Sequence, residues 1–123
     1  MSLAAQLQEA FQAFQAADLK HCFAQNKRNP GPREVADAME ARAAARAALD
    51  EVVAVLQEEE VLILDTLEQA KVFTQFLAQF PDYGNLRRVD IPGGVDERTA
   101  ARMCSIMKMV GFRPPTQTFY LPD

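Results

Sequence analysis

The feature that most constrains this chain is an alternation of strand-type and helix-type sequence between residues 61 and 121. Short apolar runs that suit buried strands alternate with longer segments in which apolar residues recur every three or four positions. The order along the chain is strand, helix, strand, helix, strand. Because this alternation is typical of helices that cover a sheet, we predict an α/β (α+β) unit with a three-stranded sheet over residues 61–121.

Local signals place the first three elements of this unit. Residues 61–64 (Val-Leu-Ile-Leu) predict a short buried strand, and a continuation of the preceding helix is the alternative. Asp65 followed by Glu68 resembles a capping box, which predicts that a new helix begins there and favours the strand. Residues 86–91 alternate between a more apolar and a more polar face, as expected of a second strand.

Turn residues mark the last helix and the last strand. After the Pro-Gly-Gly turn at 92–94, Asp96 is expected to cap a helix that ends at Gly111. Residues 116–121 alternate again and are expected to form the last strand. The helix is expected to bury Ala100, Met103, Cys104, Met107 and Val110.

Residues 1–58 predict a helical hairpin, which completes a single domain of residues 1–123. The loop signals Asn-Pro and Pro-Gly separate a helix over 3–25 from one that runs from Pro32 to about residue 57. We expect the hairpin to cover the free face of the sheet or to support a dimer. Three alanines beside the apolar stripe of the second helix predict close approach of another helix: Ala36, Ala43 and Ala47.

Two arginines stand within the apolar stripe of the second helix. Arg42 and Arg46 occupy positions where a buried helix carries apolar groups, so we expect them to reach over the rim of the helix pair with only their stems buried. The candidate protein-binding residues of the hairpin are Phe11, Phe14, Met39, Arg42 and Arg46.

Charge is unevenly distributed along the chain. Residues 1–83 hold 7 Lys or Arg and 13 Asp or Glu, a net of −6, whereas residues 84–123 hold 6 and 4, a net of +2. The second half therefore suits an acidic partner, and a solvated surface of mixed sign is the alternative. A net of +2 is small for a nucleic-acid-binding surface. The candidate contacts to nucleic acid or to an acidic partner are Arg87, Arg88, Arg98, Arg102, Lys108 and Arg113.

The sequence shows no constellation of residues for catalysis, metal binding or cofactor binding. The single histidine, His21, stands beside Cys22 without further ligands at metal spacing. Asp65 and Asp96, which lie near predicted strand ends, are expected to cap helices, and this argues against a catalytic dyad. We therefore predict no catalytic residue, no metal site and no cofactor. Methionines around the last helix suit core packing, with an adaptable partner surface as the alternative.

The closing part of the chain, residues 86–121, shows a strand, a helix that ends in Gly-Phe, and a last strand. This order resembles the closing segment of the GCN5-related N-acetyltransferase fold. The matching residues are 89–91, 98–110, 111–113 and 118–121.

The same resemblance places the acetyl-CoA-binding strand and helix of that family at residue 61 and beyond. The glycine-rich loop of the family is absent there, because residues 65–68 read Asp-Thr-Leu-Glu. Met107 stands where the family often has a tyrosine that acts as general acid. The resemblance therefore implies a degenerate relative that does not catalyse acetyl transfer.

A helix that contains Arg98, ends in Gly-Phe and precedes an alternating strand is also similar to the recognition helix and wing of winged-helix modules. Such modules place basic and polar side chains of this helix in the major groove of DNA. The contacts that this second resemblance implies are Arg98, Arg102, Lys108 and Arg113.

These patterns predict a small cytoplasmic protein that acts by binding rather than by catalysis: an adaptor, inhibitor or regulatory subunit, such as an accessory protein of a mobile element. The sequence contains neither a secretory signal nor an apolar run of the roughly 20 residues of a membrane span. We expect an unidentified protein partner, no membrane association, and a monomer or homodimer. DNA binding through the basic C-terminal half is the first alternative, and a degenerate acetyltransferase-like domain is the second.

Overall fold

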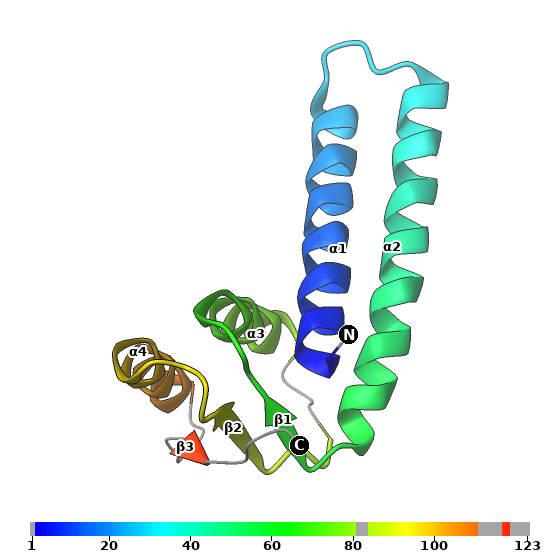
Figure 1. The fold of residues 1–123 in the computed structure, drawn as a ribbon. Coiled ribbons are helices and arrows are strands. Elements are labelled where there is room, and N and C mark those ends of the chain that lie inside the picture. The colour runs from blue at the N-terminus through cyan, green and yellow to red at the C-terminus, as the bar shows by residue number, and fades with distance from the viewer. Residues whose placement is uncertain (1, 81–83, 111–116, 119–123) are drawn as a thin grey trace.

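The structure is a computed structural model that describes residues 2–80, 84–110 and 117–118 of the 123-residue chain. Within these residues the fold is mostly helical, with four helices and a small parallel sheet (Figure 1). None of the described helices is long and apolar enough to cross a membrane. The elements in chain order are α1 (Leu3–Asn26), α2 (Pro32–Glu58), β1 (Val61–Ile63), α3 (Leu67–Gln79), β2 (Arg88–Pro92), α4 (Glu97–Met109) and β3 (Gln117–Thr118).

Both helices predicted for residues 1–58 are present with nearly the predicted bounds. The Ser2 side chain caps α1, since its Oγ accepts a hydrogen bond from the Ala5 N–H at 3.2 Å. Pro32 is the first residue of α2, where its missing N–H costs nothing. The two helices lie side by side in opposite directions and rise as a hairpin above the rest of the fold (Figure 1).

Small residues do face each other in the hairpin, but they are not the predicted ones. Ala24 of α1 and Ala38 of α2 are buried, whereas Ala36, Ala43 and Ala47 are exposed. An α-helix turns roughly 100° per residue, so a position two residues away points to the opposite side. The predicted face was therefore wrong by about half a turn.

The strand predicted at 61–64 is confirmed as β1, which pairs in parallel with β2. Leu62 stands beside Val89 in this two-stranded sheet. The two residues of β3 run parallel to the end of β2, with Gln117 beside Ile91. The rest of the strand predicted over 116–121 lies outside the described residues.

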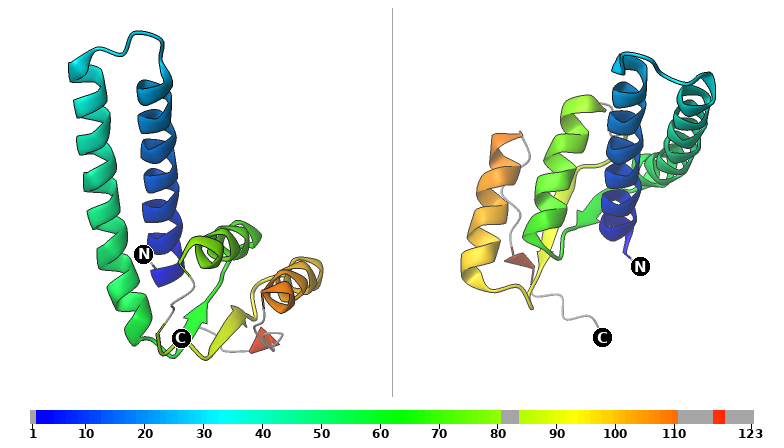
Figure 2. Two further views of the ribbon diagram at one scale, coloured as in Figure 1. Left: turned by 180° about the vertical axis from the view of Figure 1, so that it is seen from behind. Right: turned by 90° about the horizontal axis from the view of Figure 1, so that it is seen from above.

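The helices α3 and α4 lie beside each other on one face of the sheet (Figures 1 and 2). This arrangement follows from two successive strand–helix–strand connections between parallel strands, each of which returns over the sheet. The largest fully buried side chains belong to both halves of the chain and form one cluster: Leu7, Phe11, Leu49, Leu56, Leu62, Leu64, Phe73, Phe76, Val89, Ile91, Met103 and Met107.

The capping interaction of α3 differs from the predicted one by a single residue. Thr66 is the N-cap, and its Oγ1 accepts a hydrogen bond from the Gln69 N–H at 3.1 Å. The Gln69 side chain reaches back and accepts from the Asp65 N–H at 2.7 Å. The predicted pairing of Asp65 with Glu68 is therefore wrong, although the predicted start of a helix after the strand is correct.

The hairpin packs against α3 and β1 instead of covering the second face of the sheet. The Phe11 ring meets the Phe76 ring edge to face, with centroids 5.8 Å apart, and meets the Phe80 ring at 6.3 Å. Edge-to-face aromatic pairs are favourable because the positive edge of one ring faces the negative face of the other. The expectation that the hairpin covers the free face of the sheet is therefore wrong.

The buried face of α4 is narrower than predicted. Ala100, Met103 and Met107 are buried, as expected. Cys104 is only partly buried, and Val110 is 37% exposed. Val110 is the C-cap of the helix, so its side chain lies past the last turn that faces the core.

Candidate functional site

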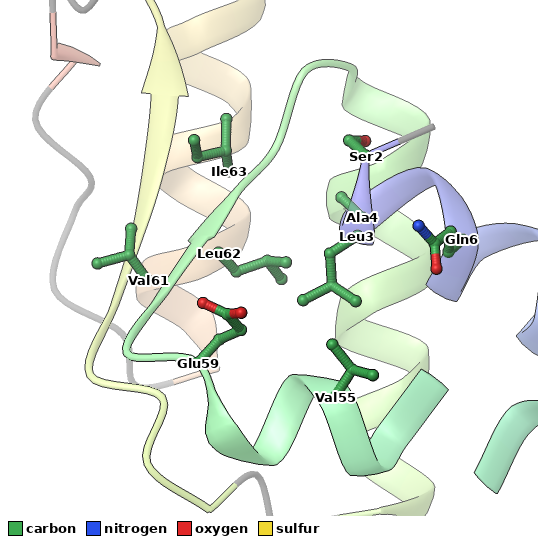
Figure 3. A pocket seen from close by; sticks show the side chains of 9 residues that line it. All are labelled: Ser2, Leu3, Ala4, Gln6, Val55, Glu59, Val61, Leu62 and Ile63. Atoms are coloured by element: carbon green, nitrogen blue, oxygen red, sulfur yellow. The ribbon is translucent and has the colours of Figure 1, made fainter. Parts of the chain in front are cut away.

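A pocket of about 280 Å³ lies where the start of α1, the end of α2 and β1 meet (Figure 3). We call it the β1 groove. Figure 3 shows the side chains of Leu3, Val55 and Leu62 converging on this space, one from each of the three elements. The lining residues are Ser2, Leu3, Ala4, Gln6, Val55, Glu59, Val61, Leu62 and Ile63.

The chain connectivity explains why these three elements meet. Glu59 is the C-cap of α2 in extended conformation, with its N–H bonded to the Leu56 carbonyl oxygen at 3.1 Å, and β1 begins two residues later. The end of α2 and the start of β1 are therefore held close together. Because α1 and α2 are antiparallel, the first turn of α1 returns to the same end of the molecule (Figure 1).

Hydrogen bonds determine which backbone groups of β1 face β2. The N–H of Leu64 donates to the Asp90 carbonyl oxygen at 2.9 Å, and the Glu60 carbonyl oxygen accepts from β2. In a parallel ladder alternate residues bond to the same neighbour. The even-numbered residues of this segment therefore bond to β2, and the peptide groups of Val61 and Ile63 point to the opposite edge.

That opposite edge of β1 is unpaired in the described part of the structure. There, no hydrogen bond is formed by the backbone N–H or C=O groups of Val61 or Ile63. A strand edge with unpaired donors and acceptors is a template on which another extended chain can pair. The β1 groove is thus bordered by a set of directional, unused hydrogen-bonding groups.

The rim of the groove exposes large apolar side chains. Val55 is 48% exposed and Ile63 is 51% exposed. Both residues line the same pocket, one from the end of α2 and one from β1 (Figure 3). Parallel sheets are usually covered on both faces, which makes an exposed isoleucine on β1 unusual for this kind of sheet.

The surroundings of the groove are acidic. Of the carboxylates at the end of α2 and around β1, Asp50 pairs with Arg46 at 3.0 Å, whereas Glu59 lines the pocket itself. Three of them, residues 58–60, follow each other at the C-terminal end of α2, and no basic residue lies in the last turn of that helix. The dipole of a helix makes its C-terminal end favourable for cations, so three carboxylates there are unfavourable for the isolated chain.

The predicted basic residues do not form one patch in the described structure. In a strand–helix–strand connection the helix runs opposite to its strands. Arg98 and Arg102 therefore lie near the end of β2. Lys108 lies roughly 15 Å from Arg98 along α4, toward the start of β2. Arg87 and Arg88 lie at that start, and Arg88 pairs with Asp90 at 3.3 Å. The predicted contact Arg113 lies outside the described residues.

The candidate residues of the hairpin have mostly structural roles. Phe11 and Phe14 are buried in the core, with 0% and 5% exposure, so neither is available to a partner at the surface. Arg42 binds Asp18 at 2.6 Å. Met39, at 54% exposure, remains open to solvent near the far end of the hairpin.

Both arginines of the α2 stripe place their guanidinium groups over aromatic rings, a contact that the sequence did not predict. The guanidinium of Arg42 lies 5.4 Å from the Phe14 ring centroid, and that of Arg46 lies 5.6 Å from the same ring and 4.7 Å from the Phe80 ring. The Arg42 and Arg46 side chains are 43% and 46% exposed. The charged groups therefore lie over the rings, where a cation is attracted to the negative face, while both side chains stay partly open to solvent.

The acidic and sulfur-containing groups considered for chemistry also lie apart. Within the described residues no three His, Cys, Asp or Glu side chains gather in a metal-binding arrangement. Asp96 caps α4, and the hydrogen bonds that it accepts from Thr99 lower its pKa below the ordinary value of 3.8. Burial raises the pKa of the Cys104 thiol, which makes it a weak nucleophile at neutral pH.

No protein-family model, curated protein or solved structure matches this chain. The two family resemblances of residues 86–121 both depend on Gly111 and Phe112, which lie outside the described residues. The site is therefore assigned from its geometry and chemistry.

The β1 groove was not among the sites predicted from sequence. The signal that points to it is the segment 47–70, which contains the apolar strand and the three consecutive glutamates 58–60 directly before it. The net charge of the whole N-terminal half does not reveal this local excess of carboxylates, because the basic residues of that half lie mostly around the hairpin loop.

Proposed function

We propose that this chain is a non-enzymatic binding protein, an adaptor or regulatory subunit, which acts through protein–protein contacts at the β1 groove. The observation that carries this proposal is an edge of β1 that has no strand partner within the described ranges, together with the exposed side chains of Val55 and Ile63. Backbone groups in need of partners and apolar surface in need of cover are together typical of a protein-binding site.

DNA binding through the C-terminal half is the second candidate function. The exposed arginines Arg98 and Arg102 stand one turn apart on α4 and favour it. A phosphate backbone is bound by basic residues that neutralise several charges at once. The separation of these arginines from Arg87 and Arg88 along the fold leaves few charges to act together, so we place protein binding first.

A pull-down from cells that express the protein tests both functions with three variants. Val55→Ser combined with Ile63→Ser makes the groove rim polar. Met109→Ser is the matched control, because Met109 is 86% exposed on α4, far from the groove. Arg98→Glu combined with Arg102→Glu reverses the charge on α4.

Protein binding at the groove predicts a protein partner that the wild type, the Met109 variant and the arginine variant all retain. The groove variant is expected to lose it, while circular dichroism shows that its helices are intact. Retention of every protein partner by the groove variant would overturn the proposed site. Recovery of nucleic acid alone, abolished by the arginine variant, would replace the proposed function by DNA binding.

A further inference from the structure

We infer that the partner enters the β1 groove as an extended, basic segment that adds a strand to the free edge of β1. This inference rests on the proposed function and names the form and the charge of the partner. It draws on the hydrogen-bonding pattern of β1, the shape of the groove and the acidic surroundings.

Backbone geometry favours an extended segment over a helix. The peptide groups of Val61 and Ile63 point away from β2 and have no hydrogen-bond partner among the described residues. An added strand supplies N–H and C=O groups at the same two-residue spacing, whereas the backbone groups of a helix bond within the helix. A bound strand therefore satisfies groups that a bound helix leaves unpaired.

The pocket accounts for the side chains of such a segment. Alternate side chains of a strand point to the same face, so every second residue of the partner reaches the apolar wall of Leu3, Val55 and Leu62. These side chains are expected to be apolar, such as valine or isoleucine. The residues between them lie on the opposite face, beside Val61, the exposed Ile63 side chain and solvent.

The carboxylates beside the groove indicate the charge of the partner's remaining residues. Glu59 lines the groove, and Glu58 and Glu60 precede and follow it in the chain, whereas Arg87 and Arg88 lie on the opposite, β2 side of β1. Glu58, Glu59 and Glu60 also stand at the negative end of the α2 dipole, where a cation is favourable. Lysine or arginine in the partner relieves both repulsions, so its solvent-facing residues are expected to be basic.

The same charges argue against a second copy of this chain as the occupant. An antiparallel pair of β1 strands from two copies brings the acidic residues before the strand, Glu59 and Glu60, near Asp65 of the other copy. Like charges opposite each other in a strand pair are destabilising. A basic segment of a different protein avoids this repulsion.

The probe for a first test is a fluorescein-labelled hexapeptide that alternates lysine and valine. Its binding to the full chain is measured by fluorescence anisotropy at low salt, next to a peptide in which glutamate replaces lysine. We expect the glutamate peptide to bind at least about tenfold more weakly, and the difference to shrink as salt rises. Equal binding of the two peptides would overturn the basic character of the partner.

Methylation of the peptide backbone tests strand addition directly. In an added strand only alternate N–H groups face β1, so methylating one alternate set of nitrogens is expected to weaken binding about tenfold. Methylating the other set is expected to leave binding almost unchanged. Equal effects of the two methylated peptides would show that the peptide does not pair with β1.

Amide hydrogen exchange locates the contact on the protein. In the free protein the amides of Val61 and Ile63 are expected to exchange faster than the amide of Leu64, which donates to β2. Addition of the lysine–valine peptide is expected to slow exchange at Val61 and Ile63. Protection of these two amides before the peptide is added, or no change after it, would overturn strand addition.

A charge variant separates loss of binding from loss of folding. Glu59→Lys places a cation at the C-terminal end of α2 and is expected to raise the melting temperature by roughly 1–4 °C. The same substitution is expected to weaken the binding of the lysine–valine peptide. Glu40→Lys is the matched control, because Glu40 is an exposed residue of the same helix roughly 28 Å away. Equal weakening by both variants would show that only the overall charge matters.

These outcomes are distinguishable from failure of the proposed function. A protein partner that depends on Val55 and Ile63, without protection of the β1 amides, leaves a protein-binding groove but overturns strand addition. Absence of any partner that depends on the groove overturns both.

Discussion

Replacement of Phe11 by alanine tests how the hairpin is joined to the α/β unit. The Phe11 side chain is fully buried, and its ring makes edge-to-face contacts with Phe76 at 5.8 Å and with Phe80 at 6.3 Å. Phe11→Ala therefore removes a large side chain from the place where the two halves meet.

The expected loss of stability is large compared with the stability of a single domain. Truncation of a buried phenylalanine to alanine costs about 3–5 kcal/mol, from lost burial and from the cavity that remains. The whole free energy of unfolding of a small domain is about 5–15 kcal/mol. For a chain of this length each kcal/mol corresponds to roughly 3–5 °C, so we expect the melting temperature to fall by roughly 10–20 °C.

Urea unfolding followed by far-UV circular dichroism measures this loss, and Phe23→Ala provides the control. Phe23 lies on the same helix but is 67% exposed, so its truncation is expected to change stability by less than about 0.5 kcal/mol. A difference of less than about 1 kcal/mol between the two variants would refute the packing of α1 against α3.

A double-mutant cycle isolates the ring contact from the rest of the packing. Phe11→Leu and Phe76→Leu keep most of the buried volume and are each expected to leave a folded protein. An edge-to-face aromatic pair predicts a coupling free energy of about 0.5–1.5 kcal/mol between them. Additive effects would show that the two rings do not interact in solution.

Three further predictions concern a turn, a thiol and a helix cap. Gly84 has φ +58°, and a Cβ there would lie 2.6 Å from a backbone oxygen at the end of α2, so Gly84→Ala is expected to cost more than about 1 kcal/mol in urea unfolding. Gly94→Ala has nothing within 4 Å and is expected to be nearly neutral, so equal effects would contradict the turn geometry. Burial raises the pKa of the Cys104 thiol, so Cys22, which is exposed, is expected to react first with a disulfide reagent at pH 8, and equal rates would contradict this. Asp96→Ala is expected to lower the melting temperature at neutral pH. Because the pKa of Asp96 is lowered in the folded state, this effect is fully present above pH 3.8 and fades as the pH falls through the lower folded value. An effect that persists in acid would contradict the cap.

Local sequence signals predicted most of the secondary structure because the interactions behind them are local. Pro32 begins a helix because its fixed φ and missing N–H suit that position and few others. Asp96 was correctly predicted as the cap of α4. The cap of α3 was misplaced because Asp65 and Thr66 both suit an N-cap, and the choice between them depends on which carboxamide or carboxylate can reach back.

The candidate site was harder to predict because it depends on contacts between distant parts of the chain. Phe11 and Phe14 were expected at an interface, yet the packing of α3 against α1 buries both. Conversely, Val55 and Ile63 have the apolar character of core residues, yet each is about half exposed in the fold, at 48% and 51%. A hydrophobic pattern identifies which residues avoid water, but it does not identify the element that covers them.

The amino-acid sequence by itself determined the order and type of the elements, since capping, helix periodicity and apolar runs act over a few residues. It also determined the excess of carboxylates in residues 47–70. Only the tertiary structure decided that the hairpin packs at the edge of the sheet beside α3, because that choice depends on how Phe11, Phe76 and Phe80 fit together. Among the described residues, this position of the hairpin leaves the far edge of β1 unpaired next to a partly apolar groove, and so it creates the candidate site.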